Sequence, residues 1–303
     1  MLSQAVDTYL AVRRTLGFQL TTEGCHLHSY ARFADARAEA FIRTETTIKW
    51  ATRGPSAPQR ARRLAVVRCF ARYLHAEDPR HDIPPEGVFG SESRPRRVPF
   101  IFSPEQLLHL LEAAARLGPA GSIRPYTYRT LFALLACTGL RIAEAINLRL
   151  QDWTADGLVI RESKFRKTRL VPLHATAQAA LERYRGRRCR IGGADDHLFV
   201  SQRGRRLSHS AAEAAFRTAV QAADLAPTTG RRPCLHSLRH TFAVRALESC
   251  PDGRDHITRQ MLALSTYLGH SNATATYWYL EATPSLLENI AEACEHWVEE
   301  AIQ

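Results

Sequence analysis

Lysine is nearly absent from this chain. Its 303 residues include three lysines, Lys49, Lys164 and Lys167, so arginine carries almost all of the positive charge. Arginine keeps its proton near neutral pH, whereas lysine can release one. Two of the three lysines stand in one short segment, which predicts that this segment needs an amine that titrates. Chance clustering is the alternative.

Cysteine pairs and long apolar runs are also missing. The seven cysteines form no C-x-x-C pair and their number is odd, which argues against a disulfide framework or a zinc ribbon. Several lie in apolar helical runs, so we expect small buried hydrophobic residues. No apolar run is long enough to span a bilayer, and residues 1–7 lack the order of a secretory signal. These absences predict a cytoplasmic protein.

Positive charge, by contrast, is abundant. The formal net charge is +11, and arginine clusters recur at residues 60–63, 94–97 and 203–206. A strongly basic chain favours a polyanionic partner, most simply nucleic acid. The alternative is a basic protein whose charges only face solvent.

Residues 1–78 are predicted to form a helical N-terminal domain, because apolar residues recur at helical spacing. The expected helices are 2–16, 23–39 with Thr22 as its cap, 46–52, and a long helix from 58 to about 75. The buried face of the long helix should comprise Leu64, Val67, Phe70 and Leu74. Its other face carries Arg60, Arg62, Arg63, Arg68 and Arg72. This arginine face predicts a DNA clamp, with a solvated amphipathic helix as the alternative.

Residues 79–101 are predicted to be a basic, proline-rich linker that leads to a second domain over residues 102–303. In the second domain Ser103 is the expected cap of a helix that begins at Pro104 and runs to about 117. Further helices are expected at about 125–137, from Arg141, and at 209–223, 237–249, 257–268, 272–280 and 284–301. Strands are expected at 158–162 and 169–173, with a third at 197–200. The predicted fold class is mainly α with a small antiparallel β-sheet.

Five side chains in this domain suit attack on a phosphodiester without metal. Arg141 begins a helix just after Gly139, and Arg239 lies three residues after His236 on one helix face. Two arginines so placed can hold the oxygens of one phosphate. His270 lies nine residues before Tyr279, which offers a phenol nucleophile. For Arg141 taken alone, a salt bridge to Glu144 is the better interpretation.

Together these motifs resemble the tyrosine recombinases of the phage-integrase type. The match rests on Thr-Gly-Leu-Arg141-Ile-Ala-Glu, His236-Ser-Leu-Arg239-His, Leu-Gly-His270 and the tyrosine nine residues later. The resemblance covers residues 138–280 and implies an integrase-type catalytic domain at 102–303. By the same resemblance, residues 1–78 would be a helical core-binding domain. It implies double-stranded DNA as partner, a synaptic tetramer of this chain, accessory proteins, and an origin on a mobile element.

The resemblance also implies a role for each site residue. Tyr279 would attack the scissile phosphate and form a 3′-phosphotyrosyl link, while Arg141 and Arg239 would stabilise the crowded phosphorus. His236 and His270 would handle protons. A hairpin lysine would protonate the leaving 5′-oxygen, with neither ATP, metal nor any other cofactor.

Two assignments keep an alternative. Lys164 is preferred as the acid because Ser163–Arg169 aligns with the family's Gly-Lys-Gly-x-Lys-x-Arg, although both glycines are replaced; Lys167 is the alternative. The spacing from His270 favours Tyr279 over Tyr277 as nucleophile, since the two point about 200° apart on a helix.

Further interpretations concern metal binding, assembly and activity. The pair His236 and His240 could hold zinc, but no third ligand is evident beyond His270 or His256, and we predict no metal site. The helix at 284–301 could pack on its own domain or dock on a neighbouring protomer, which we favour. A type IB-like topoisomerase or a non-catalytic DNA-binding protein on the same fold are the alternative functions, and a metal-dependent phosphohydrolase is a third.

Overall fold

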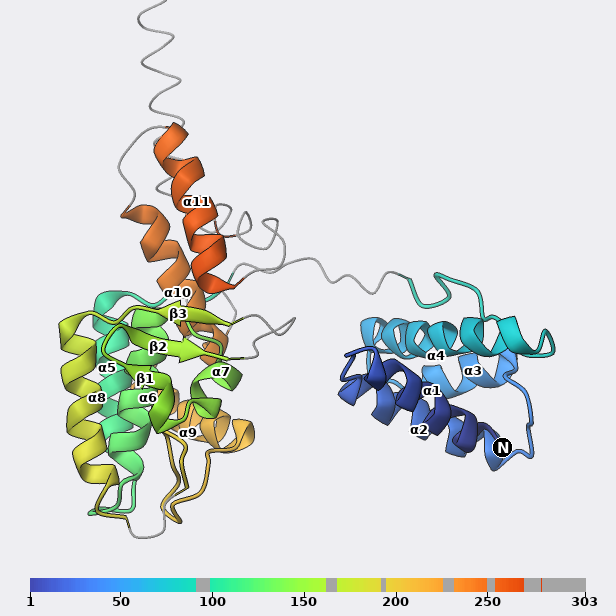
Figure 1. Cartoon of the computed structure of the whole chain (residues 1–303), viewed down its shortest axis with the longest axis horizontal. Coiled ribbons are helices and arrows are strands. Elements are labelled where there is room, and N and C mark those ends of the chain that lie inside the picture. Colours follow the sequence, from blue (N-terminus) through green and yellow to red (C-terminus); the bar gives the residue numbers. More distant parts are fainter. Residues whose placement is uncertain are drawn as a thin grey trace, which may run out of the picture. The chain divides into compact units, whose positions relative to one another are not determined.

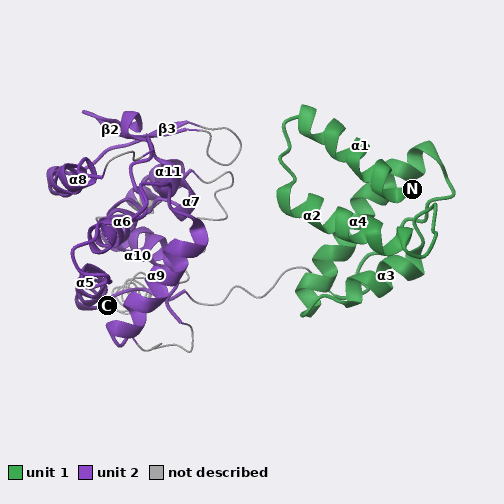
Figure 2. Ribbon diagram, turned by 90° about the horizontal axis from the view of Figure 1, so that it is seen from below, with its two compact units in different colours: residues 1–97 green, residues 98–303 purple. Residues whose placement is uncertain are grey.

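A computed structural model shows two compact units, residues Met1–Arg97 and Val98–Gln303 (Figures 1 and 2). The structure describes residues 1–90, 99–161, 168–191, 195–225, 232–249, 254–269 and 279. Within these residues the chain is mainly helical with one small antiparallel sheet, which confirms the predicted fold class. The expected helix at 284–301, and that at 272–280 apart from Tyr279, lie outside them.

The first unit consists of helices α1 (Leu2–Thr15), α2 (Thr21–Asp35), α3 (Thr44–Thr52) and α4 (Ala57–Glu77). Their shared core includes the predicted face of α4, since Leu64, Val67, Phe70 and Leu74 are all buried. At its centre the Tyr30 and Trp50 rings meet edge to face with centroids 5.4 Å apart. Ring pairs in this geometry add to the stability that area burial supplies.

Helix α2 differs from its prediction at both ends. Thr22 lies inside the helix and does not cap it, because the chain turns earlier, at Leu20, whose φ is +46°. The helix ends at Asp35, whose carboxylate accepts the amide protons of Leu2 and Ser3 at 2.9 and 3.2 Å. Those amides begin α1 and have no partner within their own helix. Hydrogen bonds therefore join the last residue of α2 to the start of α1.

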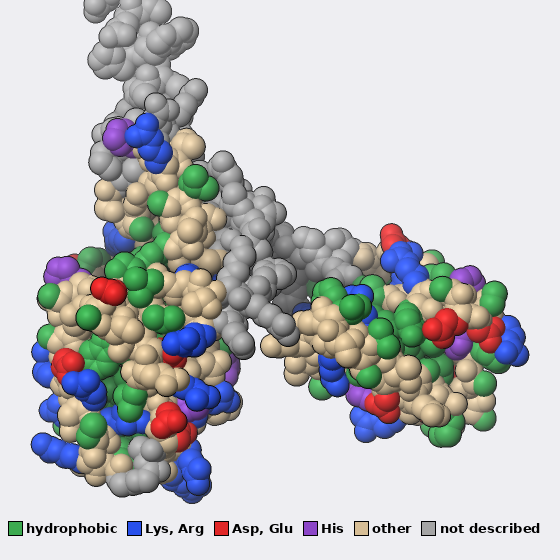
Figure 3. Space-filling view, viewed as in Figure 1, with side chains coloured by type: hydrophobic (Ala, Val, Ile, Leu, Met, Phe, Trp, Pro, Cys, Tyr) green, Lys and Arg blue, Asp and Glu red, His purple; other side chains and the backbone are tan. Residues whose placement is uncertain are grey.

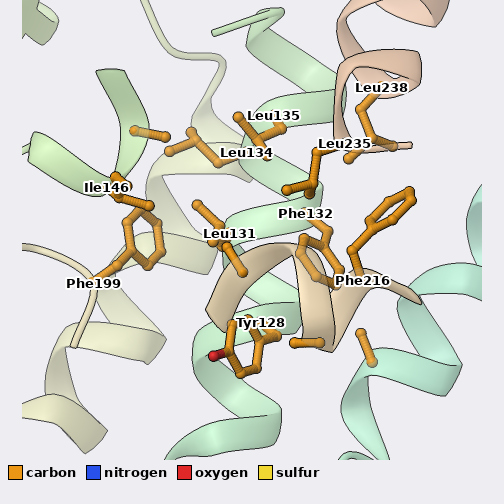
Figure 4. Packing of buried hydrophobic residues seen from close by; sticks show 14 of the residues in the cluster. Tyr128, Leu131, Phe132, Leu134, Leu135, Ile146, Phe199, Phe216, Leu235 and Leu238 are labelled. Atoms are coloured by element: carbon orange, nitrogen blue, oxygen red, sulfur yellow. The ribbon is translucent and has the colours of Figure 1, made fainter. Parts of the chain in front are cut away.

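The second unit is built around α6 (Arg124–Thr138), which packs against α5 (Pro104–Ala115), α8 (Ala175–Arg188) and α10 (Leu235–Glu248). Figure 4 shows two α6 side chains in the core, with Phe132 beside Phe216 of α9 (His209–Ala222) and Leu131 on the side nearer Phe199. Burial on several sides explains why the apolar residues of α6 do not follow one stripe. Ser103 caps α5 as expected, and Gln106 completes a capping box with it.

The sheet has the order β1 (Trp153–Thr154), β2 (Gly157–Ile160), β3 (Arg169–Val171), and both pairings are antiparallel. The two predicted hairpin strands are therefore confirmed, but the prediction of a third strand at 197–200 is wrong. Those residues form only isolated bridges, Arg149 with His197 and Val200 with Arg206. Leu198, Phe199 and Val200 are all fully buried in succession, so they fill the core on every side and offer no strand edge to the sheet.

Two features depart from the predictions. Helix α8 is not predicted, because its fourteen residues carry few apolar side chains, and only Leu181 and Tyr184 anchor it in the core.

The expectation of buried cysteines is wrong for the five within the described residues, which are exposed: Cys25, Cys69, Cys137, Cys189 and Cys234. The cysteines of helices α2, α4 and α6 lie on outer positions of helices whose other faces form the core.

Candidate active site

Arg239 is a buried cation at the meeting point of three helices. It lies one turn into α10, where its side chain is 2% exposed. Its guanidinium donates to the carbonyl of Gly139 at 2.6 Å and to that of Leu268 at 2.9 Å. Gly139 ends α6, and Leu268 ends α11 (Arg254–Leu268). Burial, with the nearby charge of Arg141, lowers the pKa of Arg239 to about 10, so the group remains charged at neutral pH.

Gly139 is required where it stands. Its φ is +59°, and a Cβ there would lie 2.5 Å from the Phe242 ring and 3.0 Å from Leu268. A left-handed residue at a helix C-terminus is usually glycine, since it has no Cβ to clash. This turn aims the Gly139 carbonyl at Arg239 and places Arg141 two residues later at the start of a new helix.

Arg141 is the N-cap of α7 (Ile142–Asn147) and faces the same site. Its guanidinium donates to the Gly269 carbonyl at 3.1 Å and to the Glu144 carboxylate at 2.9 Å. The salt bridge to Glu144 that the spacing suggested is therefore present. The Arg141 side chain is still 27% exposed, so it can also reach a ligand from solvent.

Glu144 also binds a second arginine, Arg169. In the sequence this arginine is noted only as the last residue of the Ser163–Arg169 motif. Arg169, in β3, donates to both carboxylate oxygens of Glu144, at 3.1 and 2.8 Å. Burial by itself raises the pKa of Glu144, but the hydrogen bonds and charges of Arg169 and Arg141 outweigh it and lower the pKa. Glu144 is consequently a buried anion held between two cations.

Tyr279 lies against this group of cations. It is 2% exposed and packs with Ala243, Val244, Leu247 and Leu268 of α10 and α11. Burial raises the pKa of its phenol, and the charge and hydrogen bond of Arg239, with the charge of Arg141, offset only part of that effect. The phenol is thus neutral at neutral pH and next to two guanidinium groups.

Two histidines extend the site along α10. His236 is exposed in the first turn. The ring of buried His240 lies 4.4 Å from the ring of His236 and 5.5 Å from that of Tyr279, measured between centroids. The structure therefore gathers Arg141, His236, Arg239 and Tyr279 in one place. Lys164, Lys167, His270 and Tyr277 lie outside the described residues.

Arg169 and His240 belong to this group without having been predicted in it. The sequence suggests only a zinc-ligand role for His240, although its spacing from His236 already puts it on the same helix face. Nothing in the local sequence pairs Arg169 with Glu144, since they are separated by twenty-five residues. The sequence could therefore have predicted that His240 lies near His236, but it could not have predicted that Arg169 pairs with Glu144.

Comparison with known proteins identifies the family. The family model described as "Phage integrase family" matches residues 101–285, which include the whole of this site. The chain belongs to the phage integrase family. It is a tyrosine recombinase, and thus an enzyme of DNA strand transfer.

The recombinase is 39% identical to a putative integrase/recombinase, y4rB, of Sinorhizobium fredii over 96% of both chains. Two solved structures share its fold. The integrase of transposon Tn1549, in complex with transposon right end DNA, has a TM-score of 0.66 at 16% identity, over 96% of this chain and 99% of that one. A lambda integrase tetramer bound to a Holliday junction has a TM-score of 0.63 at 18% identity, over 92% and 76%. Among the described residues of the recombinase, no helix is both long and apolar enough to cross a membrane.

Proposed function

We propose that the recombinase cleaves and rejoins DNA at specific sites through a 3′-phosphotyrosyl intermediate on Tyr279, without metal or ATP. The observation that carries this proposal is the position of the Tyr279 phenol, buried against Arg239 and near Arg141. A phosphate that entered here would meet a nucleophile and two fixed cations at once.

In the proposed cleavage step the Tyr279 oxygen attacks phosphorus, and the bond from phosphorus to the 5′-oxygen breaks. Arg141 and Arg239 neutralise the charge that builds on the phosphate oxygens, and their positions need little adjustment because backbone carbonyls already hold them. His236 and His270 assist with protons, and Lys164 protonates the leaving 5′-oxygen. One phosphodiester replaces another, so a 5′-hydroxyl of a second strand can reverse the step without an energy source.

Double-stranded DNA is the proposed partner, bound by a tetramer of this chain together with accessory proteins. Support comes from the charge of +11 and from the two solved structures above, whose names include transposon DNA and a Holliday junction. On the face drawn in Figure 3, Lys and Arg side chains gather at the lower end of the second unit. The exposed residues of this unit include Arg187, Arg190, Arg205 and Arg206. A mobile-element origin is supported by the likeness to a transposon integrase.

Residues 1–78 are proposed as the core-binding domain, residues 79–101 as the linker, and residues 102–303 as the catalytic domain. The arginine face of α4 contributes less free charge than the sequence suggested. Arg63 stacks on the Trp50 ring at 4.0 Å, and Arg68 pairs with Glu86. Arg62 and Arg72 also pair, with Glu23 and Glu86 at 3.2 Å, but their side chains remain about half exposed. We therefore assign any phosphate contact on this face to these two.

A nicked suicide substrate tests the proposal, since loss of a short 5′-hydroxyl fragment traps the covalent adduct. The parent protein should form an adduct that mass spectrometry locates on Tyr279, with or without EDTA. Tyr279→Phe should form none but keep its DNA affinity, because only one oxygen is removed. Tyr126→Phe is the matched control, since Tyr126 is an exposed tyrosine at the start of α6, far along that helix from Gly139. An adduct on another side chain, or none, would contradict the mechanism.

Two further assays separate the alternatives. Robust relaxation of a supercoiled plasmid that lacks a recombination site, without synapsis, would favour a topoisomerase. Lys164→Ala should slow cleavage of an ordinary 5′-oxygen, but much less that of a 5′-thio leaving group, which needs no proton. If Lys167→Ala alone shows this pattern, the acid is Lys167.

A further inference from the structure

Arg169 occupies a position that the proposed chemistry does not explain. Its side chain is only 13% exposed, and the side chain of its partner Glu144 is 7% exposed. Burial of a charged side chain is costly unless it is paired. Arg169 and Glu144 meet this condition through each other.

The contacts of Arg169 join three segments of the site. Its two terminal nitrogens bind Glu144, in the first turn of α7, and its Nε donates to the carbonyl of Tyr267 at 2.9 Å, at the end of α11. Gly269 lies directly beside the guanidinium, and a Cβ on that residue would come within 3.0 Å of it. Because the Gly269 carbonyl accepts from Arg141 at 3.1 Å, Arg169 and Arg141 hold the same turn from two sides.

Arg141, Arg169 and Glu144 together carry two positive charges and one negative charge. Two guanidinium groups share one carboxylate, so the group keeps one net positive charge. Arg169 makes the bidentate pair, while the Arg141 guanidinium makes one bond to the same carboxylate and is twice as exposed. Without Arg169, Glu144 would neutralise Arg141 completely and compete with any phosphate for it.

We propose that Arg169 is a positioning residue, which occupies Glu144 so that the charge of Arg141 stays available to the scissile phosphate. This inference rests on the proposed function and deepens it. Arg169 acts through Glu144 and Arg141 and does not itself touch the DNA. Its effect should thus fall on the rate of cleavage and leave the affinity for DNA nearly unchanged.

The test is a charge cycle in single-turnover cleavage of the suicide substrate at saturating DNA. Arg169→Gln leaves the group neutral and should slow cleavage about 100-fold, comparable to losing one donor to the reacting oxygens. Glu144→Gln with Arg169→Gln restores one net positive charge and should regain most of that rate. Arg169→Lys keeps the charge but loses the bidentate geometry, so it should cleave more slowly than the parent and faster than Arg169→Gln. The dissociation constant for DNA, measured with each protein, should differ little.

Arg188→Gln is the matched control for a purely structural effect. Arg188 is a buried arginine of the same unit, 5% exposed, that donates to the carbonyls of His197 and Asp195. Its loss should lower the melting temperature without slowing cleavage at temperatures where the protein is folded. If Arg169→Gln does not fold, the double variant with Glu144→Gln tests the inference. It keeps the net charge of the parent at this group, so the protein should cleave at a rate near that of the parent.

Three results would overturn the inference. Arg169→Gln could cleave as fast as the parent, or the double variant could be as slow as the single one. A 5′-thio substrate could remove the defect of Arg169→Gln, which would mean that Arg169 acts through the hairpin lysine. If instead the parent protein forms no adduct on Tyr279, that result refutes the proposed function. The results for the variants refute only the role of Arg169, so the two outcomes are distinguishable.

Discussion

Replacing Gly139 with alanine should damage both the stability of the second unit and its active site. At φ +59°, a side chain costs about 1–2 kcal/mol. The added Cβ would also come within 2.5 Å of Phe242 and 3.0 Å of Leu268, an overpacking that costs about 1–3 kcal/mol. The free energy of unfolding should therefore fall by about 2–5 kcal/mol, and the melting temperature by about 10 °C for a unit of this size.

The damage should reach Arg239 because relief of the clash requires α10 to move. Phe242 lies one turn after Arg239 on that helix, and the Gly139 carbonyl is itself a partner of Arg239. Cleavage of the suicide substrate should then slow even at temperatures where Gly139→Ala is folded. Calorimetry gives the stability, and single-turnover cleavage gives the activity.

Gly186→Ala provides the matched control for this substitution. Gly186 lies in α8 and is exposed, and a Cβ added there would meet no side chain of the described residues within 4 Å. Alanine should stabilise that helix by about 0.4–1 kcal/mol. If Gly139→Ala melts at the parent temperature, or if both substitutions have the same effect, the steric argument for the turn is refuted.

Three other predictions concern stability and DNA binding. Burial raises the pKa of Tyr30 to about 12 from 10.0. The contribution of its neutral phenol to the free energy of unfolding is therefore complete below about pH 10 and is lost as the pH rises toward about 12. Between these two pH values Tyr30→Phe should lose up to about 2.7 kcal/mol less of its free energy of unfolding than the parent does. An unchanged calorimetric pH profile would contradict the assignment. Ser103→Ala removes one half of a capping box and should cost about 1 kcal/mol in urea unfolding; no change would show that the cap contributes nothing. The affinity for DNA should fall steeply with salt, and Arg72→Gln should reduce the slope by about one if Arg72 contacts a phosphate. A flat salt dependence would remove the basis for the clamp.

The predicted helices were located best where a local signal marks their ends. Gly17 and Gly139 end helices with positive φ, and Ser103 with Pro104 begins one, as the sequence indicated. The errors came where the segment makes contacts with distant parts of the chain. Asp35, the last residue of α2, binds the start of α1, and residues 197–200 form isolated bridges with Arg149 and Arg206. Helix α8 lacks the periodic apolar residues on which the prediction depended.

The candidates for the chemistry follow from the order of the residues, because the spacing of Arg141, His236, Arg239, His270 and Tyr279 is a property of the chain alone. The helical fold class follows from the same source, through apolar periodicity and the glycines that end helices. How the charges of the site are shared, by contrast, depends on contacts between distant segments. Arg169 reaches Glu144 across twenty-five residues, and Arg239 bonds Gly139 across one hundred. These hydrogen bonds depend on which distant segments meet in the fold, and a contact between single polar residues leaves no periodic pattern in the sequence.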